Sequence, residues 1–244
     1  MHSMLSKKAT LYIGGVIVLG AALSLASQLR VEWRAASSEL QVASVMAALA
    51  AASLFGKVVF LSRADARNGS SWYTPLLGIL FAGSLVLSPQ MIVALVAFPH
   101  AVEWVLERAR KTPFLRSWYI QPFNFATHLV CSLAAWATFV TSRSQLTMPV
   151  AAAAAAFVYL TVNHYLVGQV LVLACKMRWM ESGVMNAKNI LTDGAFLLAG
   201  ICTALLIHAG LIVAIPIVLL LIVAQRQVAR ALVRSTAQAQ PARA

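Results

Sequence analysis

The stretch MPVAAAAAAFVYLTVNHYLVGQVLVLAC, from Met148 to Cys175, decides the fold of this chain. It contains no Asp, Glu, Lys or Arg. It is also longer than the roughly 20 apolar residues that a helix needs to cross the hydrocarbon core of a bilayer. Backbone polar groups in lipid must be satisfied within the segment, and a helix does this. We therefore predict a transmembrane helix here.

Apolar runs of this kind recur along the whole chain. Its 244 residues are 61% hydrophobic and only 11% charged, and the mean hydropathy is +0.81. Such a composition excludes a soluble domain of this size. We predict an all-α fold, a polytopic integral membrane helix bundle with about eight transmembrane segments, some of them short or broken. The predicted spans are Ala9–Ala26, Leu40–Leu61, Tyr73–Leu87, Gln90–Leu106, Ile120–Thr141, Met148–Cys175, Ile190–Ile207 and Leu211–Val228.

Two of the apolar regions are too long for one crossing and are divided in this prediction. The first, Trp72–Leu106, contains Ser88-Pro89, and proline breaks a helix. The second, Ile190–Val228, is punctuated by His208–Gly210. The bundle is predicted to occupy residues 1–229, and the polar, alanine-rich residues 230–244 are predicted to form a disordered cytoplasmic tail.

The distribution of positive charge tests the number of crossings. Of 19 Lys and Arg residues, 16 lie in the two tails, in alternate loops or in the span ends beside them, and the other loops hold only Arg30, Arg34 and Arg143. Basic residues concentrate in cytoplasmic loops, so this alternation predicts that both termini are cytoplasmic. The net charge of +12 belongs to these loops beside an anionic leaflet, and we expect no nucleic-acid partner.

Ionisable residues within the predicted spans are the first candidates for function, because they are costly in a membrane. His100 and Glu103 stand three residues apart and share one helix face. This geometry suits a metal ion or a cationic ligand. The alternative is an intrahelical pair near the membrane interface.

Two further spans carry polar side chains. Asn124, Thr127, His128 and Cys131 follow one face of the Ile120–Thr141 helix, and Asn163 and His164 stand midway along Met148–Cys175. Embedded Asn residues either join neighbouring helices by hydrogen bonds or line a ligand pocket. The predicted ligand-binding residues are Asn124, Asn163, Glu103, His100, His128 and His164. Two histidines without a fixed spacing are a weak metal signal, and we expect no metal or cofactor.

Asp193 is interpreted differently, as part of a cap. With Asn189 and Thr192 it opens the predicted Ile190–Ile207 helix, where such residues commonly bind backbone N–H groups. No zinc-protease HExxH, nucleophile elbow, phosphate loop or dinucleotide fingerprint occurs in the sequence. Since no nucleophile–base pair or metal set can be assembled, we expect that the protein is not an enzyme.

One stretch resembles a known family. RSWYIQPFNFA, from Arg116 to Ala126, opens a helix after a basic loop, and YLTVN, from Tyr159 to Asn163, lies in a later span. Together with Pro216–Leu221, these motifs resemble the bacterial multi-helix membrane sensor region found ahead of HD-GYP phosphohydrolase and GGDEF diguanylate cyclase domains. The resemblance covers roughly Pro99–Arg234.

The resemblance implies a sensing or ligand-binding bundle, and with it a multi-pass protein of the cell inner membrane. In that family the membrane region feeds a cytoplasmic catalytic domain, whose residues are absent from this sequence, so the chain is expected to act on a partner in trans or to be part of a longer protein. Our first hypothesis is a non-catalytic bacterial sensor-like bundle that binds a small or lipophilic ligand and signals to a cytoplasmic or membrane partner. The alternatives are a small-solute transporter or channel, and a structural subunit of a membrane complex.

Overall fold

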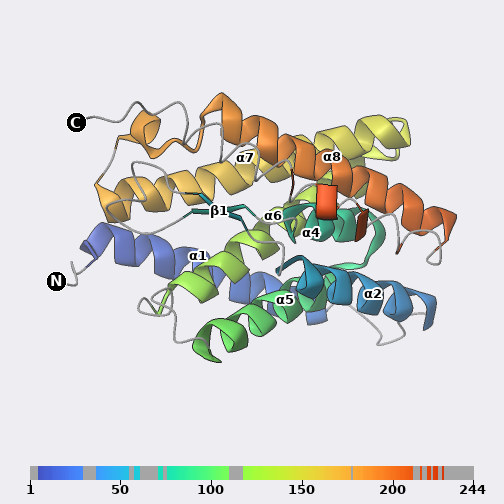
Figure 1. Ribbon diagram of the computed structural model, residues 1–244, viewed down its shortest axis with the longest axis horizontal. Coiled ribbons are helices and arrows are strands. Elements are labelled where there is room, and N and C mark those ends of the chain that lie inside the picture. Colours follow the sequence, from blue (N-terminus) through green and yellow to red (C-terminus); the bar gives the residue numbers. More distant parts are fainter. Residues whose placement is uncertain are drawn as a thin grey trace.

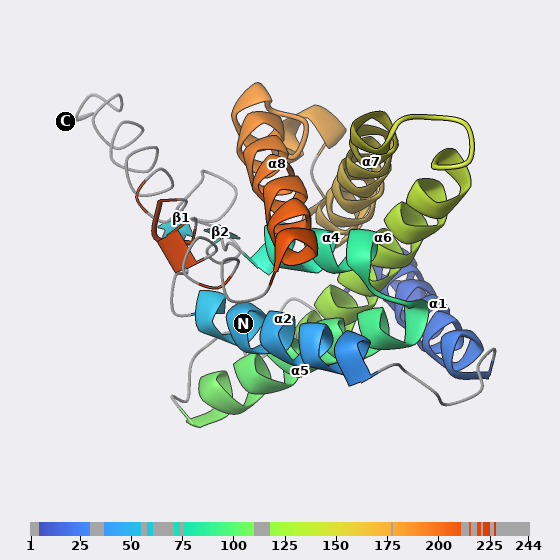
Figure 2. The same cartoon turned by 90° about the vertical axis from the view of Figure 1, so that its right-hand side faces the viewer.

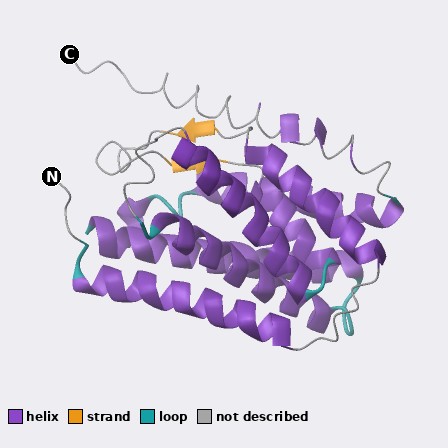
Figure 3. Cartoon of the chain, turned by 90° about the horizontal axis from the view of Figure 1, so that it is seen from below, coloured by secondary structure: helices purple, strands orange, loops and turns teal. Residues whose placement is uncertain are grey.

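A computed structural model describes residues 5–29, 37–54, 58–60, 71–73, 76–109, 118–176 and 178–210, with short pieces at 215, 219–220, 222–224 and 227. Helices dominate these parts of the chain (Figures 1 and 3). The α-helices are α1 (Lys7–Leu29), α2 (Ser37–Ser53), α4 (Leu76–Val86), α5 (Pro89–Ala109), α6 (Ile120–Ser142), α7 (Met148–Cys175) and α8 (Ala187–Ala209). They are joined by a short 3-10 helix, η3 (Trp179–Ser182), and two strands, β1 (Val58–Phe60) and β2 (Ser71–Tyr73).

Five of the described helices are long and apolar enough to cross a membrane: α1, α5, α6, α7 and α8. Their outward side chains are apolar too. Leu11 of α1 is 75% exposed, Phe157 of α7 is 70% exposed and Leu198 of α8 is 62% exposed. Large apolar faces around a whole bundle require an apolar surrounding, which is lipid. The chain is therefore a multi-pass helical membrane protein.

The predicted spans agree with the helices where apolar composition is uninterrupted, and differ near the strands. The Met148–Cys175 prediction matches α7 residue for residue. In contrast, the predicted Leu40–Leu61 helix ends at Ser53, and Val58–Phe60 pairs antiparallel with Ser71–Tyr73. β-branched and aromatic residues such as these favour strands, which explains the correction. The last predicted span and the predicted tail fall mostly outside the described residues.

Helix α4 is short and enclosed. Its 11 residues make it roughly 16 Å long, about half the thickness of the hydrocarbon core. All of its residues from Leu76 to Leu85 are buried, and it packs against α2, α5, α6, α7 and α8. Figure 2 shows α4 between α8 on one side and α2 with α5 on the other. The predicted Tyr73–Leu87 crossing is therefore replaced by a half-length helix inside the bundle.

Glycines let two pairs of helices approach closely. A Cβ atom added to Gly78 of α4 would lie 2.6 Å from the Phe196 carbonyl oxygen of α8, and one added to Gly200 would lie 2.5 Å from the Gly78 oxygen. Similarly, a Cβ at Gly20 of α1 would lie 2.6 Å from the Ala126 Cβ of α6. Close backbone packing of this kind is the usual source of helix association in lipid.

Hydrogen bonds place the helix ends relative to one another. The side-chain amide of Gln90 donates to the Ser27 carbonyl oxygen at 2.7 Å, so α5 begins where α1 ends. The Tyr12 hydroxyl donates to the Leu166 carbonyl oxygen at 3.2 Å, and the Ser6 hydroxyl donates to the Leu173 carbonyl oxygen at 3.3 Å. Because Ser6, which directly precedes α1, meets the later of the two α7 residues, the two helices run antiparallel. We call the end where α1 begins and α5 and α7 finish the basic end. It carries Lys7, Lys8, Arg108, Lys176 and Arg178.

This arrangement brings the predicted non-cytoplasmic connections to one end of the bundle. The end of α1, the start of α2 and the start of α5 meet there, because the Ser88 N–H donates to the Glu39 carboxylate at 2.7 Å. The α6–α7 connection, with Arg143, lies at the same end. The assignment of the basic end to the cytoplasm remains a prediction.

Candidate functional site

The buried face of α5 changes from apolar to polar in the middle of the helix. Its first half is apolar, and its second half carries three ionisable side chains one or two turns apart. In chain order the buried residues are Ile92, Leu95, Val96, Pro99, His100, Glu103 and Glu107. Because ionisable groups are expensive within a membrane, this second half is the first place to look for function.

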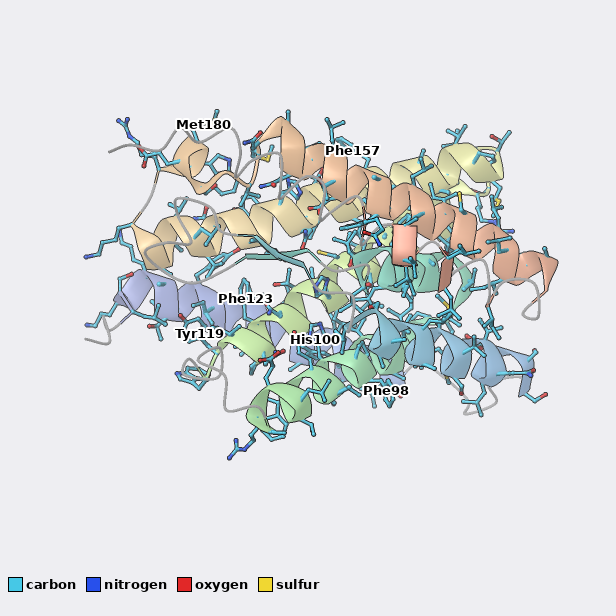
Figure 4. All side chains as sticks on the ribbon, in the orientation of Figure 1. Phe98, His100, Tyr119, Phe123, Phe157 and Met180 are labelled. Carbon is cyan, nitrogen blue, oxygen red and sulfur yellow. The ribbon has the colours of Figure 1, made fainter. Side chains whose placement is uncertain are left out.

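His100 is at the centre of the polar half. It is 6% exposed, whereas Phe98 on the outer side of the same helix is 48% exposed (Figure 4). The ring stacks on His128 of α6, with centroids 5.3 Å apart and planes 30° apart. Phe125, one turn before His128, meets the same ring edge-on with centroids 6.3 Å apart. The α5–α6 interface therefore closes around this imidazole.

The hydrogen-bonding capacity of His100 is unused. Its Nδ1 lies 3.6 Å from a Glu103 carboxylate oxygen, which is a charge contact and longer than a hydrogen bond. Neither ring nitrogen has a hydrogen-bond partner among the described residues. A buried polar group left in this way costs about 1–3 kcal/mol. Such a group in a native fold calls for a functional explanation.

His128 connects this point to a third helix. Its Nδ1 lies 3.2 Å from the hydroxyl oxygen of Tyr159 on α7. Tyr159 is fully buried and packs edge-on against Phe81 of α4, with centroids 5.7 Å apart. The enclosed helix α4 therefore forms one wall of the site, and His100, His128 and Tyr159 join α5, α6 and α7.

The two predicted asparagines lie one turn from this contact. Asn124 precedes His128 by four residues on α6, and Asn163 follows Tyr159 by four residues on the antiparallel α7. Each asparagine therefore lies one turn nearer the basic end than the His128–Tyr159 contact. The helix register therefore places Asn124 and Asn163 at the same level, as a shared pocket requires. Asn163 is buried and Asn124 is partly buried.

His164 faces a different neighbour from the other predicted residues. Its Nε2 lies 2.8 Å from a carboxylate oxygen of Asp193 on α8. The prediction that Asp193 caps its helix is wrong, because α8 begins at Ala187 and Asp193 lies almost two turns inside it. A carboxylate at that depth needs a partner, and His164 supplies one. We therefore regard the pair as a link between α7 and α8.

Two buried polar residues were missed by the sequence analysis. Glu107 follows His100 by seven residues on α5, and Gln121 precedes His128 by seven residues on α6. Neither amide atom of the Gln121 side chain has a hydrogen-bond partner within the part of the chain that the structure describes. A seven-residue spacing, two helix turns, is the signal that would have found both.

We call these five residues the polar seam: His100, Glu103, Glu107, Gln121 and His128. They offer donors and acceptors for hydrogen bonds, and two carboxylates. These groups can bind a small molecule by hydrogen bonds and charge. Within the described ranges, no three His, Cys, Asp or Glu side chains are grouped so that they could hold a metal ion.

Comparison of the chain with known protein families, with curated proteins and with solved structures finds no match. The likeness to a bacterial membrane sensor region thus remains a prediction from the motifs, and the geometry of the seam is the main guide to function.

Proposed function

We propose that this protein is a non-catalytic membrane sensor that binds a small ligand within the bundle, at the polar seam. The ligand would contact His100 and Glu103 on α5 and His128 on α6. Asn124 and Asn163 would extend the pocket by one turn. His164, which already pairs with Asp193, would act indirectly by fixing α7 against α8.

The observation that carries this proposal is the buried imidazole of His100, neither of whose nitrogens has a hydrogen-bond partner among the described residues. The 3.6 Å contact with Glu103 does not replace these hydrogen bonds, so burial of the ring is costly to the bundle. A ligand that both donates and accepts a hydrogen bond would remove the cost. Binding and a change in the packing of α5 against α6 are then coupled, because the same ring forms the interface.

The signal to a partner protein would arise from this coupling between ligand binding and helix packing. A ligand favours the conformation that it binds better, and the shift is limited by the difference in affinity. Helix α5 finishes and α6 begins at the basic end, where a cytoplasmic partner could detect their movement. The resemblance to the sensor family likewise implies a sensing or ligand-binding bundle.

The test is ligand capture by the purified protein in mild detergent. Extracted small molecules are identified by mass spectrometry, and the leading compounds are then tested by thermal shift. We expect His100→Leu to lower the affinity for a captured compound by at least about tenfold, the equivalent of one lost hydrogen bond. His208→Leu, at an exposed position of α8, is the matched control and should bind as the wild type does.

The same variant separates binding from folding. Leucine removes an unsatisfied buried group, so His100→Leu should be at least as stable as the wild type. Unchanged affinity in a folded His100→Leu protein would refute the proposed site.

A second candidate function, transport of a small solute, is favoured by α4. Broken or half-length helices enclosed in a bundle are typical of transporter substrate sites, and α4 reaches the site through the contact of Phe81 with Tyr159. Flux of a captured compound across proteoliposomes, with no other protein present, would favour transport over sensing.

A further inference from the structure

The polar seam continues from the proposed site to the basic end of the bundle. Glu107 lies two turns beyond His100 on α5, and Gln121 lies two turns before His128 on α6. Both side chains are buried. Since His100 stacks on His128 and the two helices run antiparallel, the register places Glu107 and Gln121 at the same level, roughly 10 Å from the stacked rings.

In the opposite direction the row of polar side chains ends within one turn. Ser132 follows His128 by four residues on α6; it is buried, and its hydroxyl has no hydrogen-bond partner among the described residues. Beyond Ser132, the buried side chains of α5, α6 and α7 on the way to that end are apolar or small. They include Leu95, Val96, Ala135, Phe139, Ala152 and Ala155. Polar side chains therefore connect the site with one end of the bundle, and apolar packing separates it from the other.

A second observation points to an occupant of the seam. Gln121 is 9% exposed, and its amide oxygen and nitrogen both lack hydrogen-bond partners among the described residues. His100, at the far end of the seam, has the same property. These two side chains lie in one row, about two helix turns apart. Water molecules or a polar ligand in the seam would give both of them hydrogen-bond partners.

We infer that the seam is the route by which the ligand reaches its site, that this route opens only at the basic end, and that the ligand is accordingly a small water-soluble molecule with hydrogen-bonding groups. A lipid or another apolar molecule entering sideways from the bilayer would not need a row of carboxylates and amides. This inference rests on the proposed function for the identity of the site, but it can be tested without a ligand.

The experiment measures how fast a small, charged, membrane-impermeant thiol reagent modifies single cysteines. The reagent is the trimethylammonium methanethiosulfonate MTSET. Cys131, Cys175 and Cys202 are first replaced by alanine, and Gln121→Cys and Glu107→Cys are then made separately in this background. The matched control is Ala135→Cys, which is also buried on α6 but lies in the apolar half.

Two exposed positions report the sidedness of each membrane preparation. Lys176→Cys marks the basic end, and Ser144→Cys marks the opposite end. Intact cells and inverted membrane vesicles are compared. We expect Gln121→Cys to react only in the preparation that labels Lys176→Cys, and at least about tenfold faster than Ala135→Cys, because reaction requires a water-exposed thiolate.

Equal rates at Gln121→Cys and Ala135→Cys in folded protein, with Glu107→Cys equally unreactive, would overturn the inference. So would labelling from the side marked by Ser144→Cys. These outcomes are independent of the ligand test. If neither Gln121→Cys nor Glu107→Cys is labelled but the protein still captures a ligand, only the route is refuted. If the cysteines are labelled but no ligand is captured, only the proposed function is refuted.

Discussion

His128 and Tyr159 form the contact at which three helices meet. The 3.2 Å contact between the imidazole Nδ1 and the phenol oxygen joins α6 to α7, and the other side of the same imidazole stacks on His100 of α5. The imidazole of His128 therefore contacts both of the other helices. Removing the phenol oxygen should accordingly weaken the bundle by a measurable amount.

Tyr159→Phe should lower the free energy of unfolding by about 1 kcal/mol. Phenylalanine keeps the edge-on contact with Phe81 and removes only the hydroxyl that faces His128. Reversible unfolding in detergent measures the change. Tyr165→Phe on the same helix is the control, because Tyr165 is exposed and its change should stay within about 0.5 kcal/mol. Equal effects of the two substitutions would argue against the contact.

The link between His164 and Asp193 should show strong coupling. Replacing either residue alone by leucine leaves the other polar group inside the bundle without its partner, at a cost of about 1–3 kcal/mol. The double substitution removes both groups. We expect it to cost at least about 0.5 kcal/mol less than the sum of the single changes. A double-mutant cycle by unfolding measures this difference, and strict additivity would contradict the pairing.

The close approach of α4 and α8 predicts opposite effects for two glycines of α8. Gly200→Ala places a Cβ atom 2.5 Å from the Gly78 carbonyl oxygen, and we expect a loss of about 1–3 kcal/mol in stability. At Gly194 nothing lies within 4 Å of the added atom, so Gly194→Ala should be neutral or stabilising by up to about 1 kcal/mol. Melting temperatures of the two variants give the comparison. A stable Gly200→Ala protein would show that the helices are further apart.

The bond from the Ser88 N–H to Glu39 should fix the start of α5. Glu39→Ala removes the acceptor, and we expect a loss of about 1 kcal/mol or slightly more, because the acceptor is a carboxylate. Ser38→Ala, at the exposed neighbouring position, is the control and should have little effect. Hydrogen exchange at the first turn of α5 gives a local measurement. Unchanged exchange there in Glu39→Ala would contradict this role.

The sequence predicts well whatever depends on local composition. The bounds of α7 follow from an uninterrupted apolar run that allows one structure in lipid. The pairing of His100 with Glu103 follows from helical spacing alone. Both predictions need no knowledge of neighbouring segments.

What the sequence does not predict depends on contacts between distant segments. The strand pairing of Val58–Phe60 with Ser71–Tyr73 replaces part of a predicted helix. The residues of one strand do not indicate with which segment it pairs. Asp193 resembles a helix cap until His164, 29 residues away, is placed beside it. In the same way, the enclosure of α4 results from five neighbouring helices and not from its own residues.

A hydrated polar seam would also determine where the electric field of the membrane acts. Voltage drops across the low-dielectric part of a membrane, where 100 mV is worth about 2.3 kcal/mol per elementary charge. With the proposed route open at the basic end, that part would lie beyond His100, where the buried face of α5 is apolar. A charged ligand arriving along the seam would therefore cross little of the voltage, and its occupancy would follow its concentration at the basic end almost independently of the membrane potential.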